Sequence, residues 1–102
     1  MTYGTRQGVK RILHIEDDTA WDNELDECLI AANDRIDNRL KQFVTVPLST
    51  VPDMITKITE NMAAGMFCEN HVKERPTEMA LFTSRADRWL EEYIKQNHGL
   101  WT

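Results

Sequence analysis

One long amphipathic pattern constrains this chain more than any other feature of its sequence. Between Thr19 and Phe43, apolar residues recur at spacings of three and four, the period of one helix face. Acidic residues precede the middle of the segment and basic ones follow it, which suits the two ends of the helix dipole. The apolar stripe consists of Trp21, Leu25, Cys28, Leu29, Ala32, Ile36, Leu40 and Phe43. The pattern predicts a helix with one buried face.

A short helix is predicted before this segment, from Thr5 to Ile15, because apolar residues recur there at helical spacing. Two acidic residues, Asp17 and Asp18, follow it. A carboxylate in front of a helix accepts hydrogen bonds from the free N–H groups of the first turn. We therefore expect Asp17 or Asp18 to cap the long helix. The apolar residues of the short helix are Val9, Ile12 and Leu13.

An extended loop is predicted from Val44 to Val51, because β-branched residues and Pro47 interrupt the helical pattern. A third helix is predicted from about Pro52 to Val72, with the proline in its first position and Thr50 as its cap. The small residues in its middle would let another helix approach closely. Its expected buried or small residues are Ile55, Ile58, Met62, Ala63, Ala64, Gly65, Met66 and Cys68.

A fourth helix is predicted from about Thr77 to Asn97, and Gly99 is expected to end it with a left-handed residue. The residues expected to face inward are Leu81, Phe82, Ala86, Trp89, Leu90, Tyr93 and Ile94. The fold class predicted from these elements is all-α: a small bundle of about four helices with an extended loop between the second and third. We expect one helical domain over residues 1–99 and a short C-terminal tail over residues 100–102.

The composition excludes several classes of protein. A chain of 102 residues is long enough for one core, and its net charge of −5 disfavours a nucleic-acid binder, which needs a basic stripe. The cysteines Cys28 and Cys68 both lie in predicted helices, so we expect reduced thiols in a cytoplasm. Residues 1–11 lack the apolar core of a signal peptide, and the apolar run over residues 62–68 is too short to span a bilayer. No membrane insertion is implied.

Thiol and imidazole groups suggest chemistry only weakly. Cys68 and His71 are spaced to present two ligands to one zinc ion, but a structural site needs four, so Cys28 and either His14 or His98 would have to converge with them. The same pair could supply a nucleophile and a base, yet no oxyanion-hole loop or third orienting group is visible. Core thiols and a surface histidine are the plainer interpretation. We expect no enzyme, no metal and no cofactor.

An acidic run without any basic residue surrounds the start of the long helix. It lacks the glycine and alternating oxygen ligands of a calcium loop. It is either a solvated helix start or a charged subunit contact or channel lining, with a basic complement from the first helix. The run is Glu16, Asp17, Asp18, Asp22, Glu24, Asp26 and Glu27, and the candidate interface or channel-lining residues are Arg6, Lys10, Arg11, Asp17, Asp18, Asp22 and Glu24.

The last predicted helix carries cations, and a tryptophan lies beyond its end. Acidic residues interrupt its cations at spacings of three and four, which favours surface ion pairs over a nucleic-acid patch. The cations are Arg85, Arg88 and Lys95, and the acids are Asp87, Glu91 and Glu92. Trp21 and Trp89 lie in apolar stripes and are expected in the core. Trp101, beyond the helix end, either folds back over the bundle or anchors in a pocket of another protein.

The order of these elements resembles the head–tail connector (adaptor) proteins of tailed phages and related tailed viruses. The similarity covers nearly the whole chain and consists mainly of helix spacing together with a Val-Pro helix start. The segments that carry it are Val9-Lys10-Arg11-Ile12-Leu13, Asp22-Asn23-Glu24-Leu25, Ala31-Ala32-Asn33-Asp34-Arg35-Ile36-Asp37, Val51-Pro52-Asp53-Met54-Ile55, Ala63-Ala64-Gly65-Met66-Phe67 and Arg88-Trp89-Leu90.

This resemblance implies a structural virion protein that forms a ring, dodecameric in the family, beneath the portal protein. The ring would extend the DNA channel toward a tail-side connector or stopper protein, and DNA would pass through without sequence-specific binding. The end of the chain would reach along the portal, which assigns Leu100 and Trp101 a docking role. The protein would reside in the neck of the virion after assembly in the host cytoplasm.

A small helical adaptor or regulator is the rival interpretation. Such a protein would act as a monomer or dimer and bind one partner. Its binding surface would be either the Leu100-Trp101 end or a methionine-rich surface made of Met54, Met62, Met66 and Met79. Self-assembly separates the two hypotheses.

Overall fold

Four helices form the chain in the computed structural model, which describes residues 2–71 and 76–98, without the side chains of 76–81, 83 and 98. They are α1 (Arg6–Leu13), α2 (Asp22–Leu40), α3 (Asp53–Asn70) and α4 (Pro76–His98). A long loop joins α2 to α3, and the described residues contain no strand. The all-α prediction is confirmed. Among the described residues, no helix is long and apolar enough to cross a membrane.

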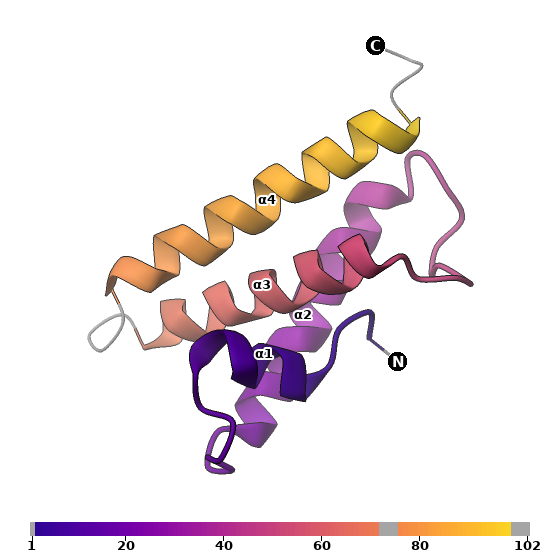
Figure 1. Cartoon of the computed structure of the whole chain (residues 1–102). Coiled ribbons are helices and arrows are strands. Elements are labelled where there is room, and N and C mark those ends of the chain that lie inside the picture. The colour runs from indigo at the N-terminus through magenta and orange to yellow at the C-terminus, as the bar shows by residue number, and fades with distance from the viewer. Residues whose placement is uncertain (1, 72–75, 99–102) are drawn as a thin grey trace.

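Helix α3 is the centre of the bundle and packs against each of the other three helices. Figure 1 shows α4 running along one side of α3, α1 on the other side, and α2 crossing behind. Its middle is buried on all sides, because it carries the small residues Ala63, Ala64 and Gly65 in succession. Ala86 of α4 is also fully buried. Small residues on α3 and α4 therefore allow the close approach that the sequence predicted.

The predicted apolar stripes form the core. In α2 they are Leu25, Cys28, Leu29, Ala32, Ile36 and Leu40; in α3, Ile55, Ile58, Met62 and Cys68; in α4, Phe82, Ala86, Leu90 and Ile94. The residues at the edges of the stripes are only partly buried and pack against this core, among them Trp21, Phe43, Met66, Trp89 and Tyr93. The side chain of Leu81 lies outside the described residues.

The first two helices are shorter than predicted. Helix α1 ends at Leu13, because His14 adopts the left-handed conformation with φ of 61° and closes the helix. Helix α2 begins at Asp22 and has no side-chain cap. The capping prediction for Asp17 or Asp18 is wrong: the Asp18 carboxylate accepts hydrogen bonds from the Ala20 N–H and the Trp21 Nε1–H, within the turn before the helix.

The start of α3 also differs from the prediction by one residue. Pro52 has an extended ψ of 149° and stands before the helix rather than in its first position. Its carbonyl accepts hydrogen bonds from the N–H groups of Ile55 and Thr56. No side chain caps this end, so the predicted cap at Thr50 is absent.

The N-terminal segment ties α2 to the long loop. The Tyr3 hydroxyl donates a hydrogen bond to the Asp37 carboxylate and accepts one from the Leu48 N–H at 2.9 Å. The Tyr3 N–H donates to Asn33 Oδ1 at 2.6 Å. Burial first, and then the hydrogen bond to Asp37, raise the pKa of the Tyr3 hydroxyl above its ordinary value. Tyr3 is buried and thus joins three segments that are distant in sequence.

A glutamate of α3 holds the start of α1. Glu60 Oε2 accepts hydrogen bonds from the Thr5 N–H at 2.8 Å and from the Thr5 hydroxyl at 3.0 Å. A Cβ atom at Gly8 would lie only 2.1 to 2.3 Å from the Glu60 carboxyl atoms, and one at Gly4 would lie 2.7 Å from Glu60 Cγ. Glycine at these two positions therefore makes room for the glutamate side chain.

Candidate functional site

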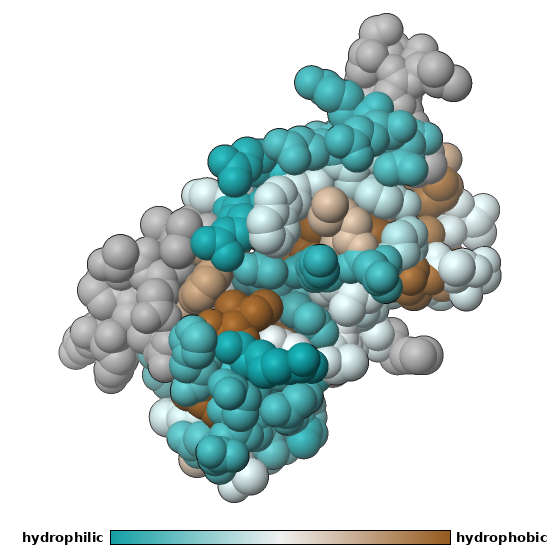
Figure 2. Space-filling model, viewed as in Figure 1, coloured by the Kyte–Doolittle hydropathy of each residue, from teal (hydrophilic) through white to brown (hydrophobic). Residues whose placement is uncertain are grey.

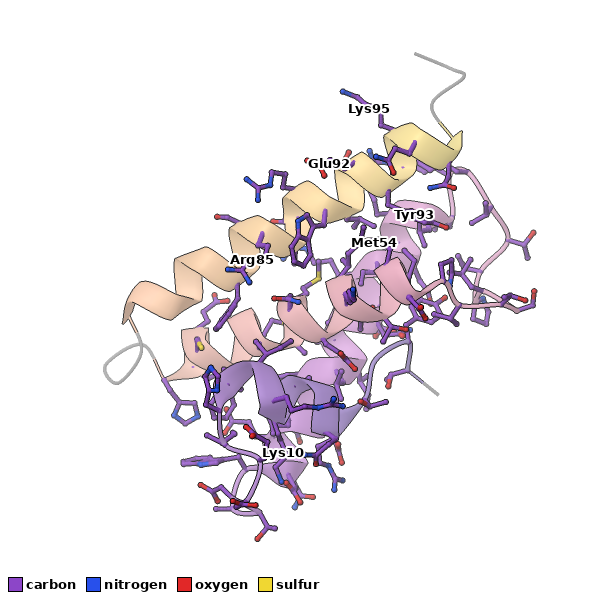
Figure 3. The ribbon with its side chains drawn as sticks, viewed as in Figure 1. Lys10, Met54, Arg85, Glu92, Tyr93 and Lys95 are labelled. Carbon is purple, nitrogen blue, oxygen red and sulfur yellow. The ribbon has the colours of Figure 1, made fainter. Side chains whose placement is uncertain are left out.

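Basic residues of α1 form ion pairs with acidic residues at the start of α2, so these charges pair inside a single copy of the chain. Arg6 of α1 makes two hydrogen bonds to the Asp26 carboxylate, at 2.9 and 2.5 Å, and contacts Asp22 at 3.3 Å. Lys10 Nζ lies 2.9 Å from Asp22 Oδ1, and its side chain is only 5% exposed. A buried ammonium requires such a partner, because an unpaired charge away from water is costly. Lys10 projects from α1 in Figure 3.

These ion pairs fasten α1 to α2. The hydrogen bonds from Arg6 lower the pKa of Asp26, and the Asp26 carboxylate in turn raises the pKa of Arg6. Because Arg6 and Asp26 are largely exposed, solvent screens their attraction and the pair adds little stability. The basic complement expected for the acidic run is thus supplied inside the chain by Arg6 and Lys10.

The remaining candidate residues are dispersed. Arg11 and Asp17 are exposed, and Asp18 serves the turn before α2. Glu24 Oε2 lies 2.9 Å from His71 Nε2 and accepts a hydrogen bond from Asn70 at 3.3 Å. Leu100 and Trp101 lie outside the described residues. A subunit contact or channel lining by the candidate residues stays a prediction.

His71 is part of an aromatic group at the end of α3. Its ring centroid lies 4.5 Å from that of Phe67 and 4.9 Å from that of Trp21. Cys68, the other half of the weak zinc or nucleophile motif, is fully buried. Within the part of the chain that the structure describes, no three His, Cys, Asp or Glu residues converge in a way that could hold a metal ion.

Acidic residues of α4 pair with α2 instead of with their own helix. Glu91 accepts two hydrogen bonds from Arg39, at 2.8 and 2.7 Å, and Asp87 contacts Arg35 at 3.4 Å. The predicted pairing along α4 is corrected here, because these two acids face cations on the neighbouring helix. The hydrogen bonds from Arg39 lower the pKa of Glu91. The pairs border a groove of about 420 Å³ between α2 and α4.

The cations of α4 do not share the ion pairs that Asp87 and Glu91 form with α2. The Arg85 guanidinium lies 5.8 Å from the ring centroid of Phe82 and 5.6 Å from that of Trp89. Arg88 and Lys95 are exposed. Figure 2 shows hydrophilic side chains along α4, and Figure 3 shows Lys95 pointing away from the bundle.

The sequence did not reveal a second groove, which lies between α2 and α3 and has a volume of about 310 Å³. Three carboxylates border it, two from α2 and one from α3, so no spacing in one segment could have shown that they meet. Apolar side chains and the Cys28 thiol complete most of the lining. The lining residues are Glu24, Glu27, Cys28, Ala31, Met66, Glu69 and Asn70.

The Cys28 thiol in this groove should be unreactive in the folded protein. Burial first, and then the charges of Glu24 and Glu27, raise its pKa to about 11. At about pH 8 roughly one thiol in a thousand is then ionised, and the thiolate is the reactive form. We expect iodoacetamide to alkylate Cys28 at least about a hundredfold more slowly in the native protein than in urea. Mass mapping of the Cys28 peptide measures this, and fast native labelling would contradict the placement.

Two large apolar side chains stand out on the described surface. Ile30 of α2 is 56% exposed and Met54 of α3 is 44% exposed. Of the methionine-rich surface predicted for an adaptor, Met62 is buried in the core and Met66 is half-buried. The side chain of Met79 lies outside the described residues. Among the methionines whose side chains the structure describes, Met54 is the exposed one, and the methionine-rich surface stays a prediction.

Comparison with known proteins identifies the family of the chain. The family model described as bacteriophage Mu, Gp36 matches residues 4–96, which include α1, α2, α3 and most of α4. The chain matches no curated protein and no solved structure.

Proposed function

The chain belongs to the bacteriophage Mu Gp36 family, a family of phage proteins, and from this premise we propose that it is a structural virion protein, a head–tail connector or adaptor. It forms a ring between the portal and the tail and extends the DNA channel. Its place is the neck of the virion, after assembly in the host cytoplasm. The observation that carries the proposal is the family match across the four-helix bundle, in a chain whose segments resemble those of connector proteins.

The contacts of this connector are with other proteins. Copies of the chain bind one another, the portal lies on one side and a tail-side connector or stopper on the other. The net charge of −5 suits a channel wall along which DNA slides without sticking. The protein works without catalysis, metal or cofactor. Leu100 and Trp101 dock on the portal, as the resemblance implies.

The test is the mass of the purified protein by light scattering, alone and mixed with the portal protein of the same phage. We expect a ring-sized assembly alone or a stable complex with the portal. A chain truncated after Gly99 should lose the portal complex and keep its helical circular dichroism spectrum, because the tail lies beyond α4. A monomer or dimer that ignores the portal would contradict the connector function and favour the small adaptor.

A further inference from the structure

The groove between α2 and α3 is lined by both apolar and acidic residues. Cys28, Ala31 and Met66 are its apolar lining, and Glu24, Glu27 and Glu69 contribute three carboxylates. Long cationic side chains match such a surface, because their methylene stems pack on apolar atoms while the charged head stays at the edge. The groove lies between two helices, so a third helix can present such side chains to it.

An exposed apolar side chain lies next to the groove. Ile30 is the more exposed of the two large apolar residues on the described surface. It lies three residues after Glu27, which lines the groove, so the two side chains are neighbours on the helix surface. Ile30 does not line the groove, so a partner would contact it only by extending past Glu27.

Charges on two separate surfaces of the described chain lack partners. The Glu24 carboxylate contacts His71 and accepts a hydrogen bond from Asn70. In contrast, no ion pair among the described residues involves Glu27 or Glu69. The same holds in α4 for Arg88 and Lys95, both exposed. The acidic surface and the basic surface are thus electrostatically complementary.

The cations of α4 form a row on one stripe of the helix. Arg85, Arg88 and Lys95 are separated by three and seven residues, so their side chains lie along one face. The acids Asp87 and Glu91 turn toward α2, where Arg35 and Arg39 neutralise them. Glu92 lies on the same stripe as the three cations. With this one acid included, the stripe keeps a net positive charge.

Building on the connector function, we propose that the groove between α2 and α3 binds the cationic row of α4, Arg88 foremost, from a second copy of the chain. The groove and the row are different surfaces on different helices. A contact between them is therefore heterologous: each copy offers its groove to one neighbour and its row to the other. Repetition of such a contact closes a ring when the rotation between copies permits.

Charge reversal tests this contact. Glu27→Arg places a cation opposite the row, and Arg88→Glu places an acid opposite the groove, so each variant alone should assemble about tenfold more weakly than wild type. An equimolar mixture of the two variants should assemble again, because every contact between unlike chains restores opposite charges. The chain carrying both substitutions should do the same by itself. Lys41→Glu changes an exposed charge that belongs neither to the lining of the groove nor to the row, and this variant should assemble like wild type.

Assembly is measured by light scattering with and without portal, and circular dichroism verifies that each variant is folded. Wild-type assembly that both reversals leave intact, or that mixing does not restore, overturns the proposed contact while the connector function stands. A Glu27→Arg variant that self-assembles normally but no longer binds the portal would show that the groove binds the portal. That result also overturns the proposed contact between copies. A wild-type chain that stays monomeric with and without portal contradicts the connector function itself.

Discussion

Replacing Ile58 by alanine should lower the free energy of unfolding by about 2–5 kcal/mol. The side chain is fully buried in α3, which packs against every other helix, so a cavity there cannot be filled by one flexible neighbour. A domain of this size has only about 5–15 kcal/mol of stability in total. Urea denaturation monitored by circular dichroism gives the change, and the thermal midpoint should fall by at least about 8 °C.

The chain contains its own control for this substitution. Ile30 sits in a helix as well but is 56% exposed, so Ile30→Ala should change the unfolding free energy of the monomer by only about 0.5 kcal/mol or less. Equal effects at both positions would mean that α3 is not the centre of the core. The comparison is made at a protein concentration where light scattering shows monomer.

Replacing Tyr3 by phenylalanine should lower the free energy of unfolding by about 1–3 kcal/mol. The substitution keeps the buried ring but removes the hydroxyl that donates to Asp37 and accepts from the Leu48 N–H. Both partners then lose a hydrogen bond in a partly buried setting. A double-mutant cycle with Asp37→Ala should show that the two substitutions together cost less than the sum of each alone.

The same variant should change the response to alkaline pH. The pKa of Tyr3 is raised in the folded protein above its ordinary value of 10.0, so folding favours the neutral hydroxyl. This contribution is complete below pH 10.0 and is lost as the pH rises through the folded-state pKa. Wild type should therefore lose more stability than Tyr3→Phe over that range, and the gap between them should narrow. Parallel pH profiles would contradict a buried Tyr3 hydroxyl.

Much of the fold follows from residue spacing, because burial of one helix face depends on side chains three and four positions apart. The stripe from Leu25 to Leu40 in α2 predicts its own burial, and it is buried. Helix ends were predicted less well. The end of α1 at His14 and the extended Pro52 before α3 depend on backbone conformation, which neighbouring packing selects.

The candidate site was predicted only in part. A basic complement to the acidic run is visible in the sequence, and Arg6 and Lys10 do meet Asp22. The bond between Arg39 and Glu91 joins residues 52 positions apart, so no local pattern could indicate it. The same applies to the groove, whose lining unites Glu27 of α2 with Glu69 of α3.

The sequence by itself determined which faces of the helices avoid water, since apolar periodicity is a property of the chain alone. It also determined the charge of each helix. Only the tertiary structure decided which charges are neutralised within the bundle and which remain on its surface. The physical reason is that an ion pair requires an approach of a few ångströms, and the packing of α1, α2 and α4 around α3 brings Arg6 to Asp26 and Arg39 to Glu91 while leaving Glu27 and Arg88 at the surface.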